Sequence, residues 1–354
     1  MARTGISREL ARPRTAMRRR SLMLPRLVPY LYILPAFVLI GIFDIWPIIF
    51  GFWISLWRWG ITAEQFVGFE NYARVARETA SINERGLQLG EMGRSLVATL
   101  YYVIGTVPLT LVLAFCFAQL LMQRIRYRAF FRTLFFVPYV TSTVAAAMVF
   151  SWIFNSRVGI ANIVLETLGL QPQTWLLDPE PIGIILGKLI GLSWPAGIPI
   201  FLAGPSLAMC VIILFGIWSS LGFSIVIFMA GLANIPTELY DAARIDGANR
   251  WRLMRNVTLP LLSPTTFFLL IVSVIGAFQS FTAVYVLSGG GGYGAGAGGP
   301  LDSTLVITVY IVRNFYERTS AVGYASAVSF VLLFILLGLT FVQFRLIGRR
   351  VHYS

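Results

Sequence analysis

Residues 233–264 read ANIPTELYDAARIDGANRWRLMRNVTLPLLSP, and the organisation of the chain follows from this stretch. Thr237 is suited to cap the start of a helix, and the acidic Asp241 suits a helix whose amino end carries partial positive charge. Gly247 can adopt the left-handed conformation that ends a helix, and residues 249–256 can form a second short helix. Long apolar runs lie on both sides. We therefore predict a helix-turn-helix between two membrane spans, with alanines small enough to admit close approach of another protein.

The composition indicates a membrane protein. Of 354 residues, 57% are hydrophobic and 12% are charged, against about 25% charged in soluble domains. The apolar residues form runs long enough to cross a hydrocarbon layer of ~30 Å, which takes about 20 helical residues. We expect an all-α integral membrane protein with six transmembrane helices, over residues 27–57, 96–122, 133–154, 206–232, 265–288 and 322–344.

Basic residues set the expected topology, because Lys and Arg concentrate in short cytoplasmic loops. Residues 1–26 carry eight arginines and form a basic cytoplasmic N-terminus, and the following apolar run is too long for a signal peptide. With both termini cytoplasmic, 19 of the 28 Lys and Arg lie inside. A crossing by the apolar stretch 182–204 would move seven of them outside, so we place that stretch at the outer face, as a re-entrant or interface-lying element. Residues 27–354 then form a multi-pass transmembrane domain.

The sequence lacks the residues that several functional classes require. Lys188, the single lysine, has no upstream glycine of the kind that a phosphate-cradling loop requires, so the chain does not bind ATP through such a loop. Cys116 and Cys210 lie inside apolar runs and are interpreted as small buried hydrophobes, and His352 has no second metal ligand. We expect no metal site, no enzymatic constellation and no nucleic-acid-binding face.

The loop resembles the cytoplasmic signature of the permease family of ATP-driven (ABC-type) importers, which is E-A-A, three residues, G, nine residues, I-x-L-P. Its seven specified positions fall on Asp241, Ala242, Ala243, Gly247, Val257, Leu259 and Pro260. Five of them are identical, and the two departures keep the negative charge and the branched apolar character. Further similarity, to the maltose and glycerol-phosphate (carbohydrate) branch of these binding-protein-dependent inner-membrane components, lies at residues 32–36, 71–72, 136–138, 230–232, 235–236 and 288–290.

The resemblance implies a type I ABC importer permease fold, in the bacterial cytoplasmic (inner) membrane, whose cytoplasmic coupling helix fits a cleft of an ATPase subunit. It implies import of a carbohydrate-like solute by alternating access, with a second homologous permease (a heterodimer), two ATPase subunits and an extracytoplasmic solute-binding protein as partners. ATP and Mg belong to the ATPase subunits, and this chain has no cofactor of its own. The coupling residues that it implies are Glu238, Asp241, Ala242, Ala243, Gly247, Leu259 and Pro260.

Polar side chains within two spans are candidates for the solute path, because such side chains tend to face the bundle interior or a cavity. Phe278 and Phe281 could add the apolar face that a sugar ring needs. The alternative is that the hydroxyls only form hydrogen bonds between helices. The candidates are Gln279, Ser280, Thr282 and Tyr285 on the fifth span and Thr141, Ser142 and Thr143 on the third.

Other functions remain as alternatives. A secondary transporter driven by an ion gradient would need charged relays near mid-membrane and inverted repeats, and no acid or base lies at the centre of the second to sixth spans. A channel or scaffold would not need an ATPase-docking signature. The stretch 182–204, which looks like an insertion before the fourth span, leaves the shape of the outer surface open, and the sequence does not name the solute.

Overall fold

The described part of the first of two compact units, Met1–Trp53, is one long helix. The computed structural model describes residues 24–83, 86–123, 126–191, 202–290, 296–318 and 321–348. α1 (Leu24–Ile40), the π-helical turn η1 (Gly41–Ile45) and α2 (Trp46–Ser55) follow one another without a break, and the last two residues of α2 belong to the second unit. None of the most apolar 18-residue window of Pro29–Ser55 is buried within the chain, so this helix presents an apolar surface all round.

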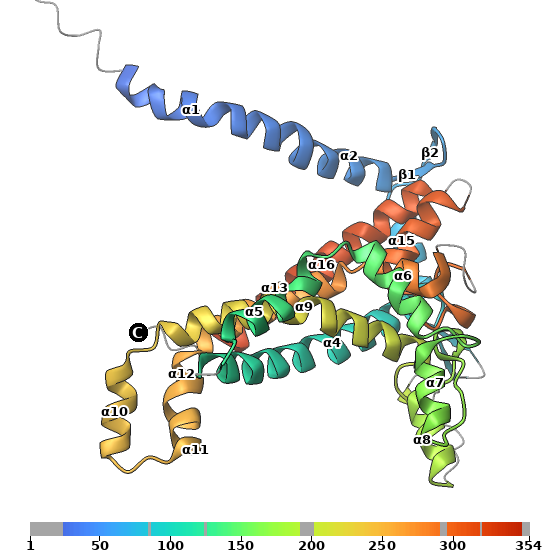
Figure 1. Ribbon diagram of the computed structural model, residues 1–354. Helices are drawn as coiled ribbons and strands as arrows, with labels where there is room; N and C mark the ends of the chain where they lie inside the picture. Colours follow the sequence, from blue (N-terminus) through green and yellow to red (C-terminus); the bar gives the residue numbers. More distant parts are fainter. Residues whose placement is uncertain are drawn as a thin grey trace, which may run out of the picture. The chain divides into compact units, whose positions relative to one another are not determined.

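The second unit, Ile54–Ser354, is built around four long helices. They are α4 (Glu91–Met122), α9 (Leu207–Ala233), α13 (Ser263–Phe278) and α16 (Val322–Leu346) (Figure 1). The backbones of α4 and α9 approach closely because glycines lie between them. A Cβ on Gly216 would stand 2.6 Å from the hydroxyl oxygen of Tyr102, and one on Gly105 would stand 2.7 Å from Ile213. Small residues at such contacts are typical of packed membrane helices.

Two expected spans are broken. The third consists of α5 (Arg128–Val140) and α6 (Thr143–Ile153), which are bent by 97°. Pro138 removes a backbone donor within α5, and the hydroxyl of Thr141 donates back to the carbonyl of Val137 at 2.8 Å, which favours a bend. In the described chain four helices are long and apolar enough to cross a membrane, or six if each bent pair counts as one span.

The fifth span, expected over 265–288, also stops early. α13 ends at Phe278, and α14 (Thr282–Tyr285) and the π-helical turn η5 (Val286–Gly290) follow after a break. The carbonyl of Ser280 accepts a hydrogen bond from the hydroxyl of Thr308 at 2.6 Å, so its partner comes from a distant segment instead of from the next helical turn. At its start α13 is bent by 63° from the helices before it.

One end of the bundle, called here the α10 end, carries the loop that joins α9 to α13. It contains α10 (Thr237–Ile245), α11 (Arg250–Leu253), the π-helical turn η4 (Met254–Thr258) and α12 (Leu259–Leu261). The last residues of α4 and α16 and the first of α5 lie at this end too (Figure 1).

The other end, called here the α15 end, holds many short elements. They are β1 (Trp57–Trp59), β2 (Ala63–Phe66), α3 (Glu70–Thr79), β3 (Ser81–Asn83), β4 (Gly86–Gln88), α7 (Ile160–Thr167), the 3-10 turns η2 (Trp175–Leu177) and η6 (Pro300–Asp302), α8 (Ile182–Leu189) and α15 (Ile307–Tyr316). The strands pair as two antiparallel hairpins, with Trp57 opposite Phe66 in the first and Ser81 opposite Gln88 in the second.

The stretch 182–204 leaves this end and returns to it. The N–H of Ile182 donates to the carbonyl of Pro205 at 2.9 Å, and the N–H of Gly183 donates to the carbonyl of Ala203 at 2.9 Å. Because its two ends are hydrogen-bonded to each other, the stretch starts and finishes on one side of the bundle. Residues 192–201 lie outside the described residues, and a re-entrant or interface-lying path for them stays a prediction.

Candidate functional site

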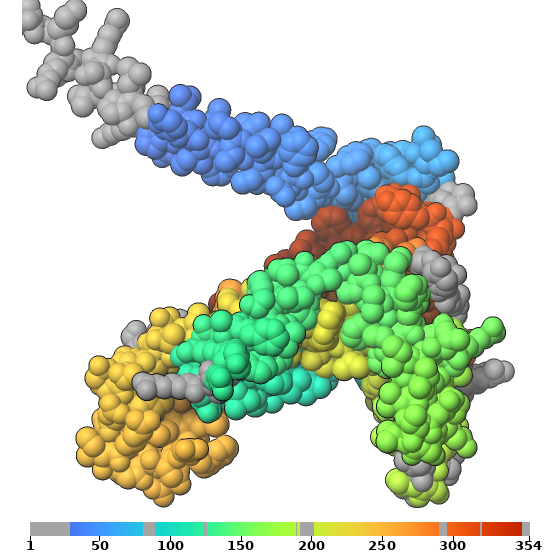
Figure 2. Space-filling model, in the orientation of Figure 1, coloured from blue at the N-terminus to red at the C-terminus, as the bar shows by residue number. Residues whose placement is uncertain are grey.

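The α10 loop, defined as residues 234–262, carries the predicted signature and projects from the second unit at the α10 end (Figures 1 and 2). α10 has Pro236 as its N-cap residue, and no side chain caps it, so the capping role predicted for Thr237 is wrong. Thr237 is instead the first helical residue. Asn249 does cap the next helix, since its side-chain oxygen accepts from the N–H of Arg252 at 2.9 Å.

α10 ends in a complete Schellman motif. The N–H of Ala248 donates to the carbonyl of Ala243 at 2.9 Å, and the N–H of Gly247 donates to the carbonyl of Arg244 at 3.0 Å. Gly247 has φ +78°, the left-handed conformation that side chains with a Cβ disfavour. The turn between α10 and α11 is therefore fixed by this glycine.

The surface of the α10 loop is unusually apolar for an exposed helix pair. Ile245 is 87% exposed, Trp251 64% and Leu239 43%. Burying three such side chains would stabilise a complex by roughly 1.5–3 kcal/mol each. Acidic side chains lie beside them, with Asp241 in an exposed ion pair with Arg244 at 2.9 Å. Such a surface is typical of a protein interface.

The predicted coupling residues do not all share this surface. Glu238, Asp241, Ala242, Gly247 and Leu259 are exposed, and Ala243 and Pro260 are half-buried. The loop is held to its own base by the Tyr240 hydroxyl, which lies 3.1 Å from the hydroxyl of Thr258. Leu259 and Pro260 lie in α12, beyond η4, so they belong to the base of the loop and not to its tip.

A cavity of about 290 Å³ lies between α4, α5, α9 and α13. Hydroxyl groups and aromatic rings line it, and none of its lining residues carries a charge. The polar lining residues are Tyr102, Thr106, Thr110, Tyr139, Ser219, Ser220, Ser224, Ser273 and Ser280.

Some of these hydroxyls already have a hydrogen-bond partner, in their own helix or in a neighbouring one. Ser219 and Ser220 both donate to the carbonyl of Gly216, at 3.1 and 2.6 Å, and Ser280 donates to the hydroxyl of Tyr102 at 3.3 Å. The hydroxyl oxygens of Thr106 and Thr110 are buried and make no hydrogen bond to the described residues. The cavity therefore combines satisfied hydroxyls with two free ones.

Of the seven residues predicted for the solute path, Ser280 lines this cavity. The others flank the two helix breaks. Tyr285 is half-buried, with its ring 5.1 Å from that of Phe281. The remaining predicted residues, Gln279, Thr282, Thr141, Ser142 and Thr143, are exposed on the isolated chain.

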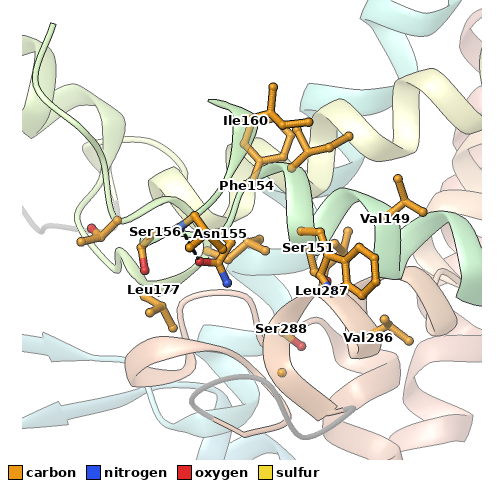
Figure 3. Close-up of a pocket in the computed structure, with 16 residues that line it drawn as sticks. Val149, Ser151, Phe154, Asn155, Ser156, Ile160, Leu177, Val286, Leu287 and Ser288 are labelled. Atoms are coloured by element: carbon orange, nitrogen blue, oxygen red, sulfur yellow. Dashed lines mark hydrogen bonds between the residues drawn. The ribbon is translucent and has the colours of Figure 1, made fainter. Parts of the chain in front are cut away.

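A larger cavity, of about 520 Å³, lies toward the α15 end (Figure 3). Val149, Phe154 and Ile160 line it from α6 and the segment after it, and Leu287 and Ser288 line it from η5. The loop beside it is organised by Asn162, whose side chain bonds to Ser156, to Gln173 and to the indole of Trp175.

A network of charged side chains closes the α15 end. Arg313 on α15 donates to Asp302 at 2.7 Å and stands 3.6 Å from Glu91 at the start of α4. Arg318 donates to the other oxygen of Glu91 at 2.6 Å, and this carboxylate raises the pKa of Arg318 against the opposing effect of burial. The network thus ties α4, η6 and α15 together.

A second group connects α3 to α15 and α16. The carboxylate of Glu78 accepts hydrogen bonds from Tyr310 and Tyr324, each at 2.7 Å, and one from Arg74 at 2.8 Å. Burial alone would raise the pKa of Glu78, but these hydrogen bonds outweigh it and the pKa is lowered. Burial raises the pKa of Tyr310 to about 12, and the neighbouring carboxylate of Glu78 adds to the effect.

Comparison with known proteins settles the family. The model of the family described as "Binding-protein-dependent transport system inner membrane component" matches residues 106–353, which is more than half of the chain. The chain belongs to this family. It is a permease component of a binding-protein-dependent transport system.

Relatives and a solved structure agree with this assignment. The permease is 30% identical to the arabinooligosaccharides transport system permease protein AraP of Bacillus subtilis, over 90% of this chain and 88% of the relative. It is also 30% identical to the trehalose/maltose transport system permease protein MalF of Thermococcus litoralis, over 90% and 93%. A chain of a crystallised bacterial alginate ABC transporter, complexed with a pentasaccharide-bound periplasmic protein, shares the fold, with a TM-score of 0.71, 19% identity, and coverage of 94% and 98%.

Sequence reasoning missed most of the hydroxyls that line the cavity of the permease. Thr106 and Thr110 are one helical turn apart on α4, and Ser219 and Ser220 are adjacent on α9. Polar residues at such spacing inside apolar runs were the available signal. The missing information was the rotation of each helix, which decides which hydroxyls face the same space.

Proposed function

We propose that the permease imports a neutral, carbohydrate-like solute and that ATP hydrolysis in two separate ATPase subunits drives it. ATP and Mg bind to those subunits, and this chain contributes no cofactor site. Each ATPase subunit binds one coupling helix, which in this chain is α10. When the two ATPase subunits close, the two permeases move as rigid bodies, and the solute path changes between inward and outward access. An extracytoplasmic solute-binding protein delivers the solute at the α15 end.

The exposed surface of α10 and α11 carries the coupling proposal. Three large apolar side chains are exposed together near the tip of this loop, those of Ile245, Trp251 and Leu239. An exposed apolar patch of this kind favours a site that another protein covers. The Schellman motif at Gly247 fixes the turn between α10 and α11, so the exposed apolar side chains of the two helices form one surface. The acids Glu238 and Asp241 add charges through which a partner can select this face.

Co-purification tests this role. The permease is co-expressed with the ATPase and with the second permease, and the complex is recovered through a tag on this chain. We expect Ile245→Asp to reduce recovery of the ATPase about tenfold or more, because loss of a central apolar anchor removes roughly 2 kcal/mol or more of binding energy. The matched control is Ile61→Asp, at a fully exposed isoleucine of the β1–β2 hairpin. Equal recovery with both variants would contradict the assignment of α10.

A second permease explains the exposed polar residues near the helix breaks. Gln279, Thr282, Thr141 and Thr143 interrupt apolar segments and are exposed on the isolated chain. Polar side chains facing lipid are costly, so these residues favour a neighbour or a water-filled path between two permeases. Irregular backbone at membrane depth is likewise found where it lines a cavity. We infer that a homologous permease packs here, which makes the transporter a heterodimer with the solute path between its halves.

The solute class follows from the uncharged cavity. Hydroxyls and aromatic rings suit a sugar, while a phosphate ester would need a cationic side chain, which the lining lacks. Two relatives are named for transport of arabinooligosaccharides and of trehalose and maltose. ATPase stimulation of the reconstituted complex, measured with its binding protein across neutral sugars and sugar phosphates, tests the class. Stimulation by phosphates alone would overturn it.

The orientation is proposed from the distribution of basic residues, with both termini and the α10 loop in the cytoplasm. In a background that lacks Cys116 and Cys210, Ile61→Cys should react with a membrane-impermeant maleimide on intact cells. Arg244→Cys should react only after permeabilisation. Labelling of Arg244→Cys from outside would invert the topology and exclude α10 as the coupling helix.

A further inference from the structure

A groove of about 330 Å³ opens between α5 and α9 at the α10 end. Arg128 and Arg132 line it from α5, and Ile225, Val226 and Met229 line it from α9. At its deep end the two helices touch, since a Cβ on Gly222 would stand 2.2 Å from the carbonyl oxygen of Phe135. The groove is thus closed toward mid-membrane.

The polarity of the groove changes along its length. Both lengths are measured from the contact between Phe135 and Gly222. On α5, Arg128 lies seven residues, or ~10 Å, before Phe135. On α9, Ala233 lies eleven residues, or ~16 Å, beyond Gly222. The two arginines therefore lie at the mouth, where α9 ends, and the aliphatic side chains lie deeper. A membrane phospholipid has the same order of polarity, with its headgroup at the interface and its acyl chains inside.

The arginines lack a counter-charge of their own. No acidic residue occurs between Glu91 and Glu166 in the sequence, and among the described residues neither Arg128 nor Arg132 takes part in an ion pair. Two guanidinium groups one helical turn apart repel each other. The Nε of Arg128 is buried without a hydrogen-bond partner, and its Nη2 donates to the sulfur of Met122 at 3.4 Å, a weak acceptor. Strong donors buried in this way favour an anion as partner.

We propose that this groove binds one anionic phospholipid, with its phosphate between Arg128 and Arg132 and one acyl chain along Val226 and Met229. A phosphate oxygen would accept from the planar fork of Arg128, satisfy its buried donor and relieve the repulsion between the two cations. The assignment of the lipid to the inner leaflet depends on the orientation proposed above. The binding of the lipid to the groove does not depend on it. A failed topology test would move the lipid to the outer leaflet and leave the site in place.

Native mass spectrometry of the full-length permease in detergent tests the site, because detergent removes the surface potential of the bilayer. Phosphatidylglycerol and phosphatidylcholine with the same acyl chains are titrated against the protein. We expect retention of phosphatidylglycerol in preference to phosphatidylcholine. Arg128→Gln/Arg132→Gln should weaken phosphatidylglycerol binding about tenfold or more, since hydrogen bonds between charged groups are lost.

Two further variants separate the parts of the site. Arg126→Gln, at an exposed arginine of the same basic segment that does not line the groove, should leave binding within about twofold. Val226→Trp fills the groove while keeping both arginines, and it should also weaken binding. Thermal unfolding checks that each variant is folded.

Three outcomes would overturn the proposal. Equal loss with Arg126→Gln would show unspecific charge attraction. Competition by millimolar inorganic phosphate, with no effect of Val226→Trp, would show a free-anion site. Unchanged lipid binding in Arg128→Gln/Arg132→Gln, together with loss of ATPase or second-permease recovery, would show that an acidic protein partner covers the arginines.

Discussion

The two ends of the bundle use their charged residues in opposite ways. At the α15 end, Arg313 has 14% of its side chain exposed and lies between two carboxylates that the same chain supplies. In the α10 loop, the ion pair between Arg244 and Asp241 is exposed by more than 60% on both sides, and large apolar side chains project beside it. The α15 end pairs these charged side chains within its own chain, whereas the α10 loop presents groups for another protein to cover. One end is built as a closed layer and the other as a contact surface.

The largest effect on the stability of the permease is expected at Arg313. Arg313→Ala removes the close partner of Asp302, which has 22% of its side chain exposed and keeps only the weaker contact with Arg94 at 3.8 Å, while Glu91 keeps Arg318 at 2.6 Å. Breaking a buried charge pair by removal of one partner costs about 3–5 kcal/mol. Thermal unfolding of the purified permease should show a correspondingly large decrease in midpoint.

Arg77 provides the matched control at the same end. It pairs with Glu70, and the two side chains are 67% and 58% exposed. Arg77→Ala should change the free energy of unfolding by no more than about 1 kcal/mol, because exposed pairs contribute little. If both variants lost equal stability, the α15 end would not be a buried layer and the contrast with the α10 loop would disappear.

A smaller effect depends on pH and involves Glu78. Its pKa is lowered in the folded protein, so the stabilisation that it gives is present above the ordinary carboxyl pKa and is lost as pH falls through the lowered value. The permease should therefore unfold at a lower temperature at acidic pH, and Glu78→Gln should reduce this dependence and cost about 1–3 kcal/mol near neutral pH.

Thermal unfolding from pH 7 down to pH 3 measures this dependence. Glu166, an exposed acidic residue of α7 at the same end, supplies the control variant Glu166→Gln, which should keep the pH dependence of the unsubstituted permease. A Glu78→Gln profile parallel to that of the unsubstituted protein would show that the tyrosine hydrogen bonds do not stabilise the ionised carboxylate.

The two ends also differ in how much of them the sequence could predict. The α10 loop follows from local signals, since Gly247 at its turn and Pro260 near its base are 13 positions apart in the sequence. The network at the α15 end joins residues far apart in the chain. Tyr310 and Glu78 are separated by 232 positions, and Arg318 and Glu91 by 227. No periodicity or motif pairs such residues without the fold.

The same reasoning explains the broken spans and the cavity. The apolar runs were sufficient to find the membrane segments, but they did not show that α13 ends at Phe278 or that the Ser280 carbonyl beyond it bonds to Thr308 from another segment. Whether Thr110 shares a space with Ser220 depends on how α4 and α9 are rotated about their axes. Composition predicts that a helix lies in the membrane. It does not predict which face of the helix contacts a neighbouring helix.

At the α10 loop, Gly247→Ala should have a moderate and local effect. A Cβ at φ +78° costs roughly 1–2 kcal/mol, which destabilises the Schellman motif and the end of α10. Hydrogen exchange should increase in α10 while the α15 end is unchanged, and solute-stimulated ATPase activity should fall in the reconstituted complex. The control is Gly338→Ala in α16, because that glycine has no positive φ and has open space beside its Cβ position. If the amides of α10 were equally protected from hydrogen exchange in Gly247→Ala and in the control variant, Gly247 would not fix this turn.

The smallest effect on stability, and the sharpest test of the contrast, is expected at the tip of the loop. Ile245→Ser and Trp251→Ala remove apolar surface that is already exposed, so the midpoint of thermal unfolding of the isolated permease should move by no more than the equivalent of about 0.5 kcal/mol. The same variants should weaken recovery of the ATPase strongly. A contact surface is defined by this combination, since its side chains contribute energy only when a partner is present. Leu262→Ala, at a fully buried leucine of the same loop, should behave in the opposite way and cost about 2–5 kcal/mol in the isolated chain. If the tip variants destabilised the isolated permease as Leu262→Ala does, Ile245 and Trp251 would pack within their own chain, and the α10 loop would be as self-contained as the α15 end.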